Sequence, residues 1–520
     1  MIDDRSRSSA QGTEACLRLV QAALLLYGLA FIWNTSFVLD GRRFFCLFED
    51  AMVSMRYARN CAAGAGLVWN PGEAPVEGYT NFLWTLLMIP WHWARLDIHF
   101  VCLPVQLLGL LCLLLNTEVV FRIAQRVTKG GALATLFSLV CTAFYLPILN
   151  WSLLGMETGL MTLVTSLACL SGLDDLHRRR VGPRPYFWLL VATLIRVDAL
   201  VFLLGTGLLL AALDPPLRRR RVFVALGLTC AIAAAQCGLR LWYYGDPLPN
   251  TYYLKMTGLP AWLRLLRGAW VNGAFLAGMA WVVPAALLGF LGFKGMRPAL
   301  LLGGMFALLL AYSVYVGGDA WEFWGGSNRF VSPAMPLLFV CAGQALALAA
   351  QRWTPTFRRH PLSVGLAAGL LTLLVITPQP GVLLLSRKTL YVGANKELVR
   401  SGLTIRDITF PAARVAVVSA GVIPYFSGRP CVDLLGKNDR YIARLPMHIN
   451  PLSPLRERFY PGHSKWDYRW SVGALKPDVI AQVGPNPWEL APFQNDYIQN
   501  GTIIIRKGSP NIRWDKLPPL

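Results

Sequence analysis

Long apolar runs, separated by short clusters of charge, constrain the fold of this chain more than any other feature of its sequence. About 20 apolar residues span the hydrocarbon core of a bilayer, and only 15% of the 520 residues are charged. We therefore predict a polytopic α-helical membrane protein with about 11 transmembrane helices, the first of them an uncleaved span. The runs that could form spans are 16–38, 98–121, 131–150, 156–173, 186–196 with 199–213, 222–242, 272–292, 299–316, 330–350 and 362–382.

Basic clusters at the ends of these runs set the predicted orientation. Lys and Arg concentrate on the cytoplasmic side of membrane proteins. The clusters are Arg122–Lys129, Arg178–Arg184, Arg218–Arg221, Lys294–Arg297 and Arg352–Arg359. They account for most of the formal charge of +21, which argues against nucleic acid as a partner. We expect a multi-pass protein of the inner (plasma) membrane, in contact with membrane lipids, with an inside N-terminus and an outside C-terminus.

Two segments need their own interpretation to keep every basic cluster on one side. Residues 186–213 are interrupted by Arg196 and Asp198, so we predict two short helices that turn on the outer side. Residues 81–97 are short and contain Pro90 and several Trp, a residue that prefers the membrane interface. We expect this second segment to lie flat on the outer surface.

The C-terminal part of the chain differs in pattern from the rest. Residues 383–520 alternate short apolar runs with Gly and Pro, and strand-like runs stand at Val415–Ser419, Val479–Val483 and Thr502–Ile505. This pattern is typical of a small mixed α/β domain. We therefore divide the chain into a transmembrane domain, 1–382, with a first outer loop at 39–97, and an extracytoplasmic domain, 383–520.

The first outer loop is the most informative stretch. Glu49 and Asp50 follow the first span, and because adjacent carboxylates repel, the pKa of one of them tends to rise. A base of that kind at the membrane surface can deprotonate a sugar hydroxyl. Alternatively, both acids only place negative charge at the N-terminus of the helix that follows. The residues alone leave both interpretations open.

This loop resembles the start of membrane glycosyltransferases of the GT-C class that use lipid-phosphate sugars. More narrowly, it is similar to the terminal β-arabinofuranosyltransferase family of actinobacterial cell walls and its wider bacterial relatives. In that family an Asp-Asp pair leads into an Arg-Tyr-Ala helix. Asp50 fits the pair, and Glu49 replaces the first Asp. The closing family motif stands intact at Val76–Trp84, and its polar members include Glu77, Tyr79 and Asn81.

Other segments are also similar to family motifs, and all of them fall on the side predicted to face outward. The resemblance covers most of the chain, and the first loop and the last of these segments carry the most specific motifs. The segments are Gly155–Thr158, Arg196–Asp198, Tyr244–Lys255, Gly317–Asp319 with Asn328–Phe330, and Asp433–Arg444.

The resemblance implies a glycosyltransferase that takes a monosaccharide from a polyprenyl-phosphate donor and transfers it to a glycan or glycolipid acceptor at the outer face. The sugar could be arabinofuranose, as in cell-wall glycan biosynthesis. Asp50, helped by Glu49, would be the catalytic base. Lys255, Arg329 and Tyr252 would bind the donor phosphate. The ammonium group of Lys255 would act as a point charge, and the planar guanidinium group of Arg329 could form two parallel hydrogen bonds. A divalent metal ion (Mg, Mn or Ca) is a candidate cofactor. The remaining site candidates are Glu77, Tyr79, Asn81, Glu157, Arg196, Asp198, Asp319 and His463.

Structural alternatives stand beside these roles. Lys255 and Arg329 could anchor to lipid headgroups, Asp198 could pair with Arg196 only to form the turn, and His463 could lie in an exposed loop. Three further aromatic residues suggest a surface on the C-terminal domain that binds glycan or anionic lipid, or else a domain core: Trp466, Tyr468 and Trp470.

The whole chain has alternatives from other classes. A transporter or flippase for a lipid-linked saccharide is one, although such proteins often contain inverted repeats and none is evident here. A glycan-binding scaffold without catalysis is the other.

Overall fold

The computed structural model describes residues 2–128, 131–293, 295–322, 328–353 and 360–517. Parts of three predicted basic clusters, at Lys129, Lys294 and 354–359, lie outside these residues. The chain forms two compact units. Unit 1 consists of Met1–Asn34, Gln106–Ala233 and Arg264–Lys388, and unit 2 consists of Thr35–Val105, Ala234–Leu263 and Thr389–Leu520.

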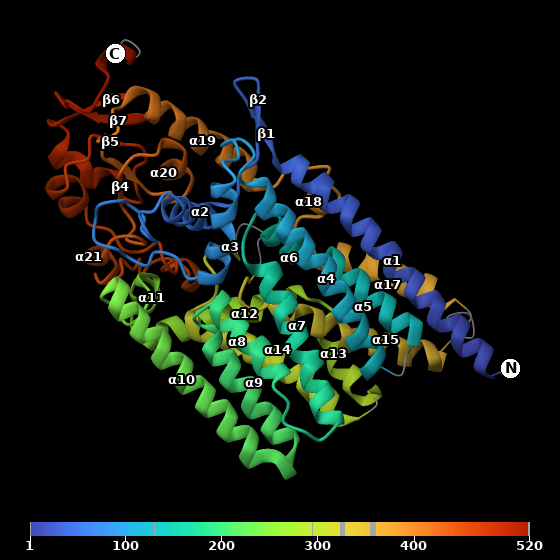
Figure 1. Ribbon diagram of the computed structural model, residues 1–520. Coiled ribbons are helices and arrows are strands. Elements are labelled where there is room, and N and C mark those ends of the chain that lie inside the picture. The colour runs from blue at the N-terminus through green and yellow to red at the C-terminus, as the bar shows by residue number, and fades with distance from the viewer. Residues whose placement is uncertain (1, 129–130, 294, 323–327, 354–359, 518–520) are drawn as a thin grey trace. The chain divides into compact units, whose positions relative to one another are not determined.

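Unit 1 is helical (Figure 1). Several of its helices continue past the unit's boundaries into segments assigned to unit 2. The helices are α1 (Ile2–Thr35), α4 (Leu103–Val127), α5 (Gly131–Phe144), α6 (Leu146–Leu153), α7 (Thr158–His177), α8 (Arg184–Ile195), α9 (Ala199–Leu213), α10 (Arg218–Tyr244), α12 (Ala261–Gly278), α13 (Val282–Gly289), α14 (Met296–Val316), α15 (Met335–Trp353), α17 (Pro361–Ile376) and α18 (Pro380–Leu383).

The lengths of these helices support a multi-pass membrane protein. Within the described residues, six helices are long and apolar enough to cross a membrane, or up to eight if each bent pair counts as one span. The pair α5 and α6 bends by 42°, and the pair α12 and α13 bends by 84°. Helices α8, α9 and α17 are apolar but shorter. The predicted number of eleven transmembrane helices therefore stays a prediction.

Helix packing in unit 1 depends on close approach of backbones. Helix α15 packs against α5 and α13, and α17 packs against α5. A Cβ atom added at Gly289 of α13 would lie 2.0 Å from the carbonyl oxygen of Cys341 in α15. Small residues allow this kind of contact between membrane helices, so the position excludes any larger side chain.

The predicted break in residues 186–213 is confirmed. Helix α8 ends at Ile195, α9 begins at Ala199, and the two helices pack against each other. Arg196 and Asp198, in the connection, form a bidentate pair of hydrogen bonds at 3.0 and 2.7 Å. The apolar run can therefore contain two charged residues at this point, because Arg196 and Asp198 pair with each other and stabilise the turn.

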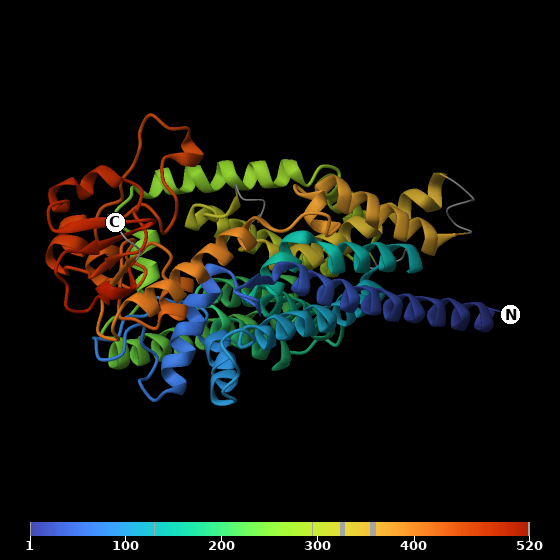
Figure 2. The same ribbon diagram turned by 90° about the horizontal axis from the view of Figure 1, so that it is seen from above.

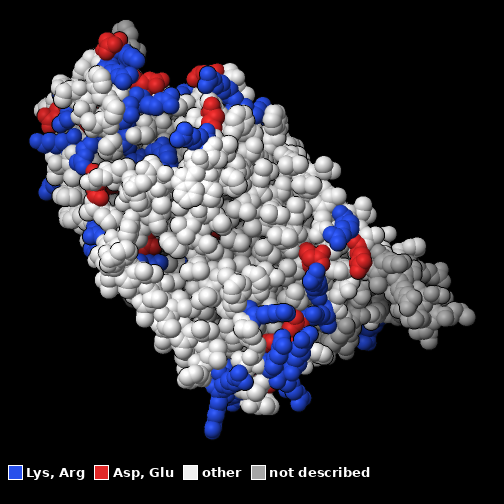
Figure 3. All heavy atoms as spheres, in the orientation of Figure 1, with Lys and Arg blue, Asp and Glu red and all other residues white. Residues whose placement is uncertain are grey.

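Three of the predicted basic clusters share one end of unit 1. Arg221 donates a hydrogen bond of 2.8 Å to the carbonyl oxygen of Arg180, and Arg126 forms an ion pair with Asp174 near the end of α7. Figure 3 shows that Lys and Arg also gather beyond the lower ends of α8 and α9, whereas the surface over the helices is mostly uncharged. This separation agrees with the pattern from which the orientation was predicted.

Unit 2 combines short helices with a mixed sheet. Its helices are α2 (Glu49–Ala62), α3 (Phe82–Trp93), α11 (Asn250–Met256), α19 (Leu390–Ile408), α20 (Val422–Ser427) and α21 (Arg440–Ala443). A hairpin is formed by β1 (Phe37–Leu39) and β2 (Arg42–Phe44), and the sheet by β3 (Val415–Val417), β4 (Cys431–Asp433), β5 (Val479–Ile480), β6 (Tyr497–Asn500) and β7 (Ile503–Arg506). The mixed α/β prediction for the C-terminal segment is confirmed.

The sheet of unit 2 has the order β4-β3-β5-β7-β6. Strand β3 is parallel to β4 and β5, whereas β7 is antiparallel to β5 and β6. In Figures 1 and 2 helix α19 lies beside these strands, and Ile405 of α19 belongs to the same buried cluster as Val415 and Val53. The sheet therefore has a hydrophobic core that includes a residue of the first outer loop.

Two of the three aromatic residues proposed for a glycan surface are core residues. Trp466 and Tyr468 are buried and pack with Val432 and Ile480 on the second face of the sheet. The prediction that they are exposed on a glycan-binding surface is wrong, because the β-sheet needs large apolar side chains on both faces. Trp470 remains partly exposed.

Candidate active site

The two acids of the first outer loop stand at the start of helix α2. Glu49 and Asp50 form its first turn, after an extended residue at Phe48. An acidic first turn favours helix formation because it complements the partial positive charge of the N-terminus. The local sequence thus explains why α2 begins here, and both carboxylates also contact segments that are distant in the sequence.

Glu49 binds the backbone at the start of helix α20. Its carboxylate accepts hydrogen bonds from the N–H groups of Gly421 and Val422, the latter at 3.0 Å. Burial raises the pKa of Glu49 to about 7, and the two N–H donors and Lys437 only partly oppose this shift. Asp50 adds to it by repulsion, as expected for adjacent carboxylates.

Asp50 forms an ion pair with Lys437. The ammonium group of Lys437 donates to Oδ1 of Asp50, and each side chain is 20% exposed. Burial lowers the pKa of Lys437, but Asp50 and Glu49 outweigh that effect and the net shift is upward. Lys437 is therefore charged at neutral pH, and the pair remains reachable from solvent.

The loop that carries Lys437 is held by its own polar residues. Both carboxylate oxygens of Asp433 accept backbone N–H groups, at Leu435 and Gly436 on one oxygen and at Asn438 on the other. From α11, the amide of Asn250 donates to the carbonyl oxygens of Gly436 and Lys437, at 2.9 and 3.0 Å. These hydrogen bonds from Asp433 and Asn250 therefore hold in place the turn that carries Lys437.

His463 and Lys255 complete this cluster. Burial lowers the pKa of His463 to about 4, helped by the positive charges of Lys437 and Lys255 and opposed by Asp50. The imidazole therefore lies within electrostatic reach of all three groups and is neutral at physiological pH. A Cβ atom added at Gly462 would lie 3.1 Å from Cε of Lys255. The alternative that His463 lies in an exposed loop is wrong in one respect, because the His463 side chain is partly buried.

The motif Val76–Trp84 supports the cluster. Glu77 forms a buried ion pair of 2.7 Å with Arg240, and its backbone carbonyl accepts from the N–H of Asn250. The hydroxyl of Tyr79 lies 3.0 Å from that of Tyr244. These contacts join the first loop to 240–250, the segment that carries Asn250 and leads to Lys255.

Asn81 and Tyr252 have different surroundings. The amide oxygen of Asn81 accepts a hydrogen bond of 2.7 Å from Ser54 of α2, and Asn81 precedes helix α3. It therefore positions two helices. Tyr252 is exposed on α11, and its assignment to donor binding stays a prediction.

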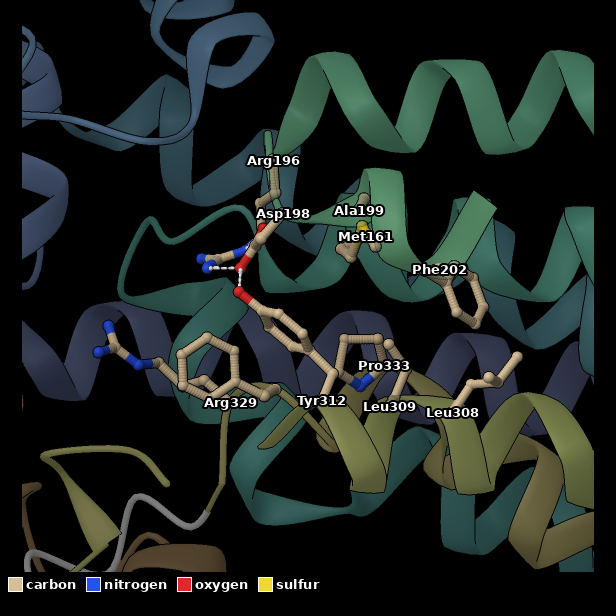
Figure 4. Close-up of a pocket in the computed structure, with 11 residues that line it drawn as sticks. Met161, Arg196, Asp198, Ala199, Phe202, Leu308, Leu309, Tyr312, Arg329 and Pro333 are labelled. Carbon is tan, nitrogen blue, oxygen red and sulfur yellow. Dashed lines mark hydrogen bonds and ion pairs between the residues drawn. The ribbon is translucent and has the colours of Figure 1, made fainter. Parts of the chain in front are cut away.

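Three other candidates meet in unit 1. Arg196 binds Glu157 at 2.8 Å and Asp198 at 2.7 Å, and the hydroxyl of Tyr312 donates to Asp198 at 2.7 Å. Figure 4 shows Tyr312 and Arg196 directed toward Asp198 at one side of a small pocket. The sequence predicted the pair of Arg196 with Asp198 but gave no sign of Tyr312.

Arg329 and Asp319 form a second pair in unit 1. Nε and Nη2 of Arg329 donate to the two carboxylate oxygens of Asp319, at 2.7 and 2.9 Å. The guanidinium carbon also lies 5.0 Å from the ring centroid of Trp151. Arg329 thus has a carboxylate as its partner, and its shared role with Lys255 in binding the donor phosphate stays a prediction because Lys255 belongs to unit 2.

Two residues with site contacts, Lys437 and Arg240, were not among the predicted site residues. Lys437 stands inside the segment Asp433–Arg444, whose resemblance to a family motif was a usable signal. Arg240 lies near the end of the apolar run of α10. A charged residue within such a run is costly in a membrane, so its position already suggested a buried partner.

Metal binding was also predicted as a candidate feature. Among the described residues, no three or more His, Cys, Asp and Glu side chains are grouped so that they could hold a metal ion. Glu49 and Asp50 are two carboxylates side by side, but they bind backbone N–H groups and an ammonium group. A divalent cofactor stays a prediction.

One family model matches the C-terminal part of the chain. Residues 389–511 match the family model described as "Domain of unknown function (DUF8728)". No curated protein matches the chain. The family match covers the sheet of unit 2 together with the segment that carries Lys437 and His463.

Solved structures with a similar fold include ArnT and AglB. ArnT from Cupriavidus metallidurans in the apo state is 16% identical with a TM-score of 0.56, and the match covers 93% of this chain and 95% of ArnT. ArnT bound to undecaprenyl phosphate is 15% identical with a TM-score of 0.55, over 91% and 94% of the two chains. The archaeal oligosaccharyltransferase AglB from Archaeoglobus fulgidus, in complex with an inhibitory peptide and a dolichol-phosphate, is 11% identical with a TM-score of 0.54, over 90% and 69%.

These similarities extend over nearly the whole chain, so they include both the helices and the C-terminal sheet. At such low identity they establish the fold and leave the substrate open. The chain has the fold of ArnT and AglB, in agreement with the GT-C fold class that its sequence predicts.

Proposed function

We propose that this chain is a membrane glycosyltransferase that transfers a monosaccharide from a polyprenyl-phosphate donor to a glycan or glycolipid acceptor. Arabinofuranose is the first donor sugar to test, because of the resemblance of the first loop. The observation that carries the proposal is the cluster of Asp50, Lys437, His463 and Lys255 on a fold like that of ArnT. Two of its solved neighbours, one bound to undecaprenyl phosphate and one in complex with a dolichol-phosphate, support the donor class.

In this proposal Asp50 is the catalytic base. It accepts the proton of an acceptor hydroxyl while that oxygen forms a bond to the anomeric carbon of the donor sugar. The bond from the anomeric carbon to the phosphate oxygen breaks, and the polyprenyl phosphate leaves with the electron pair. Lys437 orients the Asp50 carboxylate through a charge-assisted hydrogen bond, an interaction that is stronger and more directional than a neutral one.

Lys255 is the proposed partner of the leaving phosphate. An ammonium group near a developing negative charge lowers the energy of the transition state. The charges of Lys255, Lys437 and Asp50 all shift the pKa of His463, and the backbone at Gly462, next to His463, lies close to the Lys255 side chain. In this proposal Asp50 supplies the base and Lys255 supplies the cation for the leaving phosphate.

The transporter or flippase alternative is less well supported. Its typical signs are inverted repeats and charges near the bilayer midplane. The proposed catalytic cluster instead belongs to unit 2, whose C-terminal segments form a sheet.

Transfer by the purified protein is the direct test. The protein would be placed in nanodiscs with a panel of polyprenyl phosphates that carry labelled arabinofuranose, other pentoses or hexoses, together with an oligosaccharide acceptor. We expect label to move to the acceptor from one donor class. If no donor supports transfer but the protein moves a labelled lipid-linked sugar between the leaflets of vesicles, the transporter alternative would replace the proposal.

A further inference from the structure

Tyr441 and Trp470 form an aromatic pair at the surface of unit 2. Their ring centroids lie 5.0 Å apart, and the ring planes are tilted by 43°. Tyr441 belongs to helix α21 and is 46% exposed, and Trp470 belongs to the π-helical turn η6 (Arg469–Ala474) and is partly exposed. Two segments that are distant in the sequence thus present aromatic side chains at one place.

Hydrogen bonds hold both rings in position. The hydroxyl of Tyr441 donates to Oδ2 of Asp467 at 3.1 Å, and the indole N–H of Trp470 donates to Oδ2 of Asp439 at 3.0 Å. Each ring is therefore fixed by a carboxylate from the other segment. Because these side chains are already ordered, a ligand that binds them pays little conformational entropy.

The two carboxylates also have acceptor capacity left for a ligand. Oδ1 of Asp467 accepts the backbone N–H groups of Arg469 and Trp470, and Oδ1 of Asp439 accepts that of Ile442. A carboxylate offers about four lone-pair sites. Both Asp439 and Asp467 are partly exposed, so their carboxylates stand at the surface where a bound molecule would contact the aromatic pair.

The aromatic pair lies close to the proposed catalytic cluster along two chain segments. Tyr441 follows Lys437 by four residues, so their Cα atoms lie within about 14 Å even for a fully extended chain. Trp470 follows His463 by seven residues on the second segment. The two segments that bring a cation and an imidazole to Asp50 therefore continue directly into the aromatic pair.

We propose that Tyr441 and Trp470, with Asp439 and Asp467, form a subsite for a neutral sugar unit of the acceptor glycan. The inference rests on the proposed transferase function and adds the place where the acceptor is held. An aromatic face buries the apolar C–H side of a sugar ring, and the carboxylates accept hydrogen bonds from its hydroxyl groups.

A membrane contact is the competing explanation, because Tyr and Trp also favour membrane interfaces. The chemistry of this site argues against an anionic lipid surface. Its polar members are two carboxylates, which repel anionic headgroups, and the nearby Arg444 and Arg440 are paired with Asp246 at 2.7 and 3.2 Å. A neutral polyol fits the site better than a phosphate does.

The test measures binding separately from catalysis. Full-length protein would be placed in nanodiscs without glycosidic detergent, whose sugar headgroups would compete, and titrated with soluble tetrasaccharides of arabinofuranose, mannose and glucose. Variants Tyr441→Ala and Tyr441→Phe would be compared with the parent. Trp488→Ala is the matched control, since Trp488 is 70% exposed in the same unit and lies outside the aromatic pair. Thermal unfolding would be recorded for every variant.

We expect at least one tetrasaccharide to bind, Tyr441→Ala to weaken that binding about tenfold or more, and Tyr441→Phe to retain most of it, because the ring face remains. Trp488→Ala should match the parent. Absence of binding by the parent, or equal binding by Tyr441→Ala, overturns the subsite. The subsite is also overturned if Tyr441→Ala binds the tetrasaccharide as the parent does but binds anionic vesicles more weakly. A parent that binds the glycan but transfers no sugar contradicts the proposed function and leaves the subsite in place.

Discussion

Lys437 pairs with Asp50 across 387 residues of sequence. The two residues come from the segments with the most specific resemblance to family motifs, and the structure brings these segments together in unit 2. The pair links the base proposed from the first loop to the C-terminal segment. It also gives that segment a direct part in the proposed chemistry, beyond the glycan binding expected of it.

Asp50→Asn should remove most transfer activity. The substitution is nearly isosteric but removes the proton acceptor, and a general base contributes about 10²–10⁴-fold in rate. Glu49→Gln should have a smaller effect, because Glu49 binds backbone N–H groups. Initial transfer rates and donor affinity, measured in parallel, test this. An Asp50→Asn protein that transfers sugar near the parent rate would remove Asp50 from the mechanism.

Lys437→Met should lower the rate about 10- to 100-fold, because a hydrogen bond to a charged group contributes about 1.5–3 kcal/mol. Lys437→Arg should retain part of the activity, since it preserves the charge. Lys507→Met, at an exposed position of the same unit, is the control. The separation of kcat from KM is the measurement, and an unchanged kcat in Lys437→Met would show that the ion pair does not position the base.

The contribution of Glu49 to the stability of the folded protein should decrease as the pH rises. Its pKa is raised from 4.5 to about 7 in the folded state, so the folded protein binds the proton more tightly than the unfolded chain. The resulting stabilisation is fully present below about pH 4.5 and is lost as the pH rises through about 7. His463 acts in the opposite direction, because burial lowers its pKa to about 4. The difference between parent and Glu49→Gln is therefore the quantity to compare.

Thermal unfolding at pH 5 and pH 8 would measure this difference. We expect the melting temperature of the parent, relative to Glu49→Gln, to fall between the two values. A constant difference between the two proteins would contradict the raised pKa of Glu49.

Glu77→Ala should destabilise the protein by about 3–5 kcal/mol, because it leaves Arg240 buried without its partner. The double variant Glu77→Leu with Arg240→Met should recover much of that loss. The exposed pair of Glu397 and Arg400 provides the control, where Glu397→Ala should cost about 0–1 kcal/mol. Denaturation of all four proteins in one detergent would test the prediction, and equal costs for Glu77→Ala and Glu397→Ala would contradict it.

The C-terminal segment should lie outside the cytoplasm. A reporter enzyme that is active only outside the cytoplasm, fused after residue 520, should be active. The same reporter fused after residue 217, between α9 and α10 and beside the basic cluster Arg218–Arg221, should be silent. Reversed signals would invert the predicted topology and place the proposed catalytic cluster on the wrong side for a donor at the outer face.

The sequence by itself determined the features that depend on local pattern. The apolar runs correspond to helices, the break at Arg196–Asp198 lies where charge interrupts such a run, and the runs at Val415 and Val479 are strands. These predictions succeed because hydrophobic periodicity and the cost of charge in an apolar run act over a few residues. The bends between α5 and α6 and between α12 and α13 were not predicted, since helix packing decides where such runs bend.

Only the tertiary structure decided which polar residues meet. The pairs of Asp50 with Lys437 and of Glu77 with Arg240 join residues 387 and 163 positions apart. The burial of Trp466, and the pairing of Trp470 with Tyr441, depended likewise on how a strand and two loops pack. The type of a charged or aromatic residue, as read from the sequence, indicates which kinds of partner it can bind. Its actual partner is decided by the packing of distant segments, because burial makes an unpaired charge costly and so selects the arrangement in which the charges are paired.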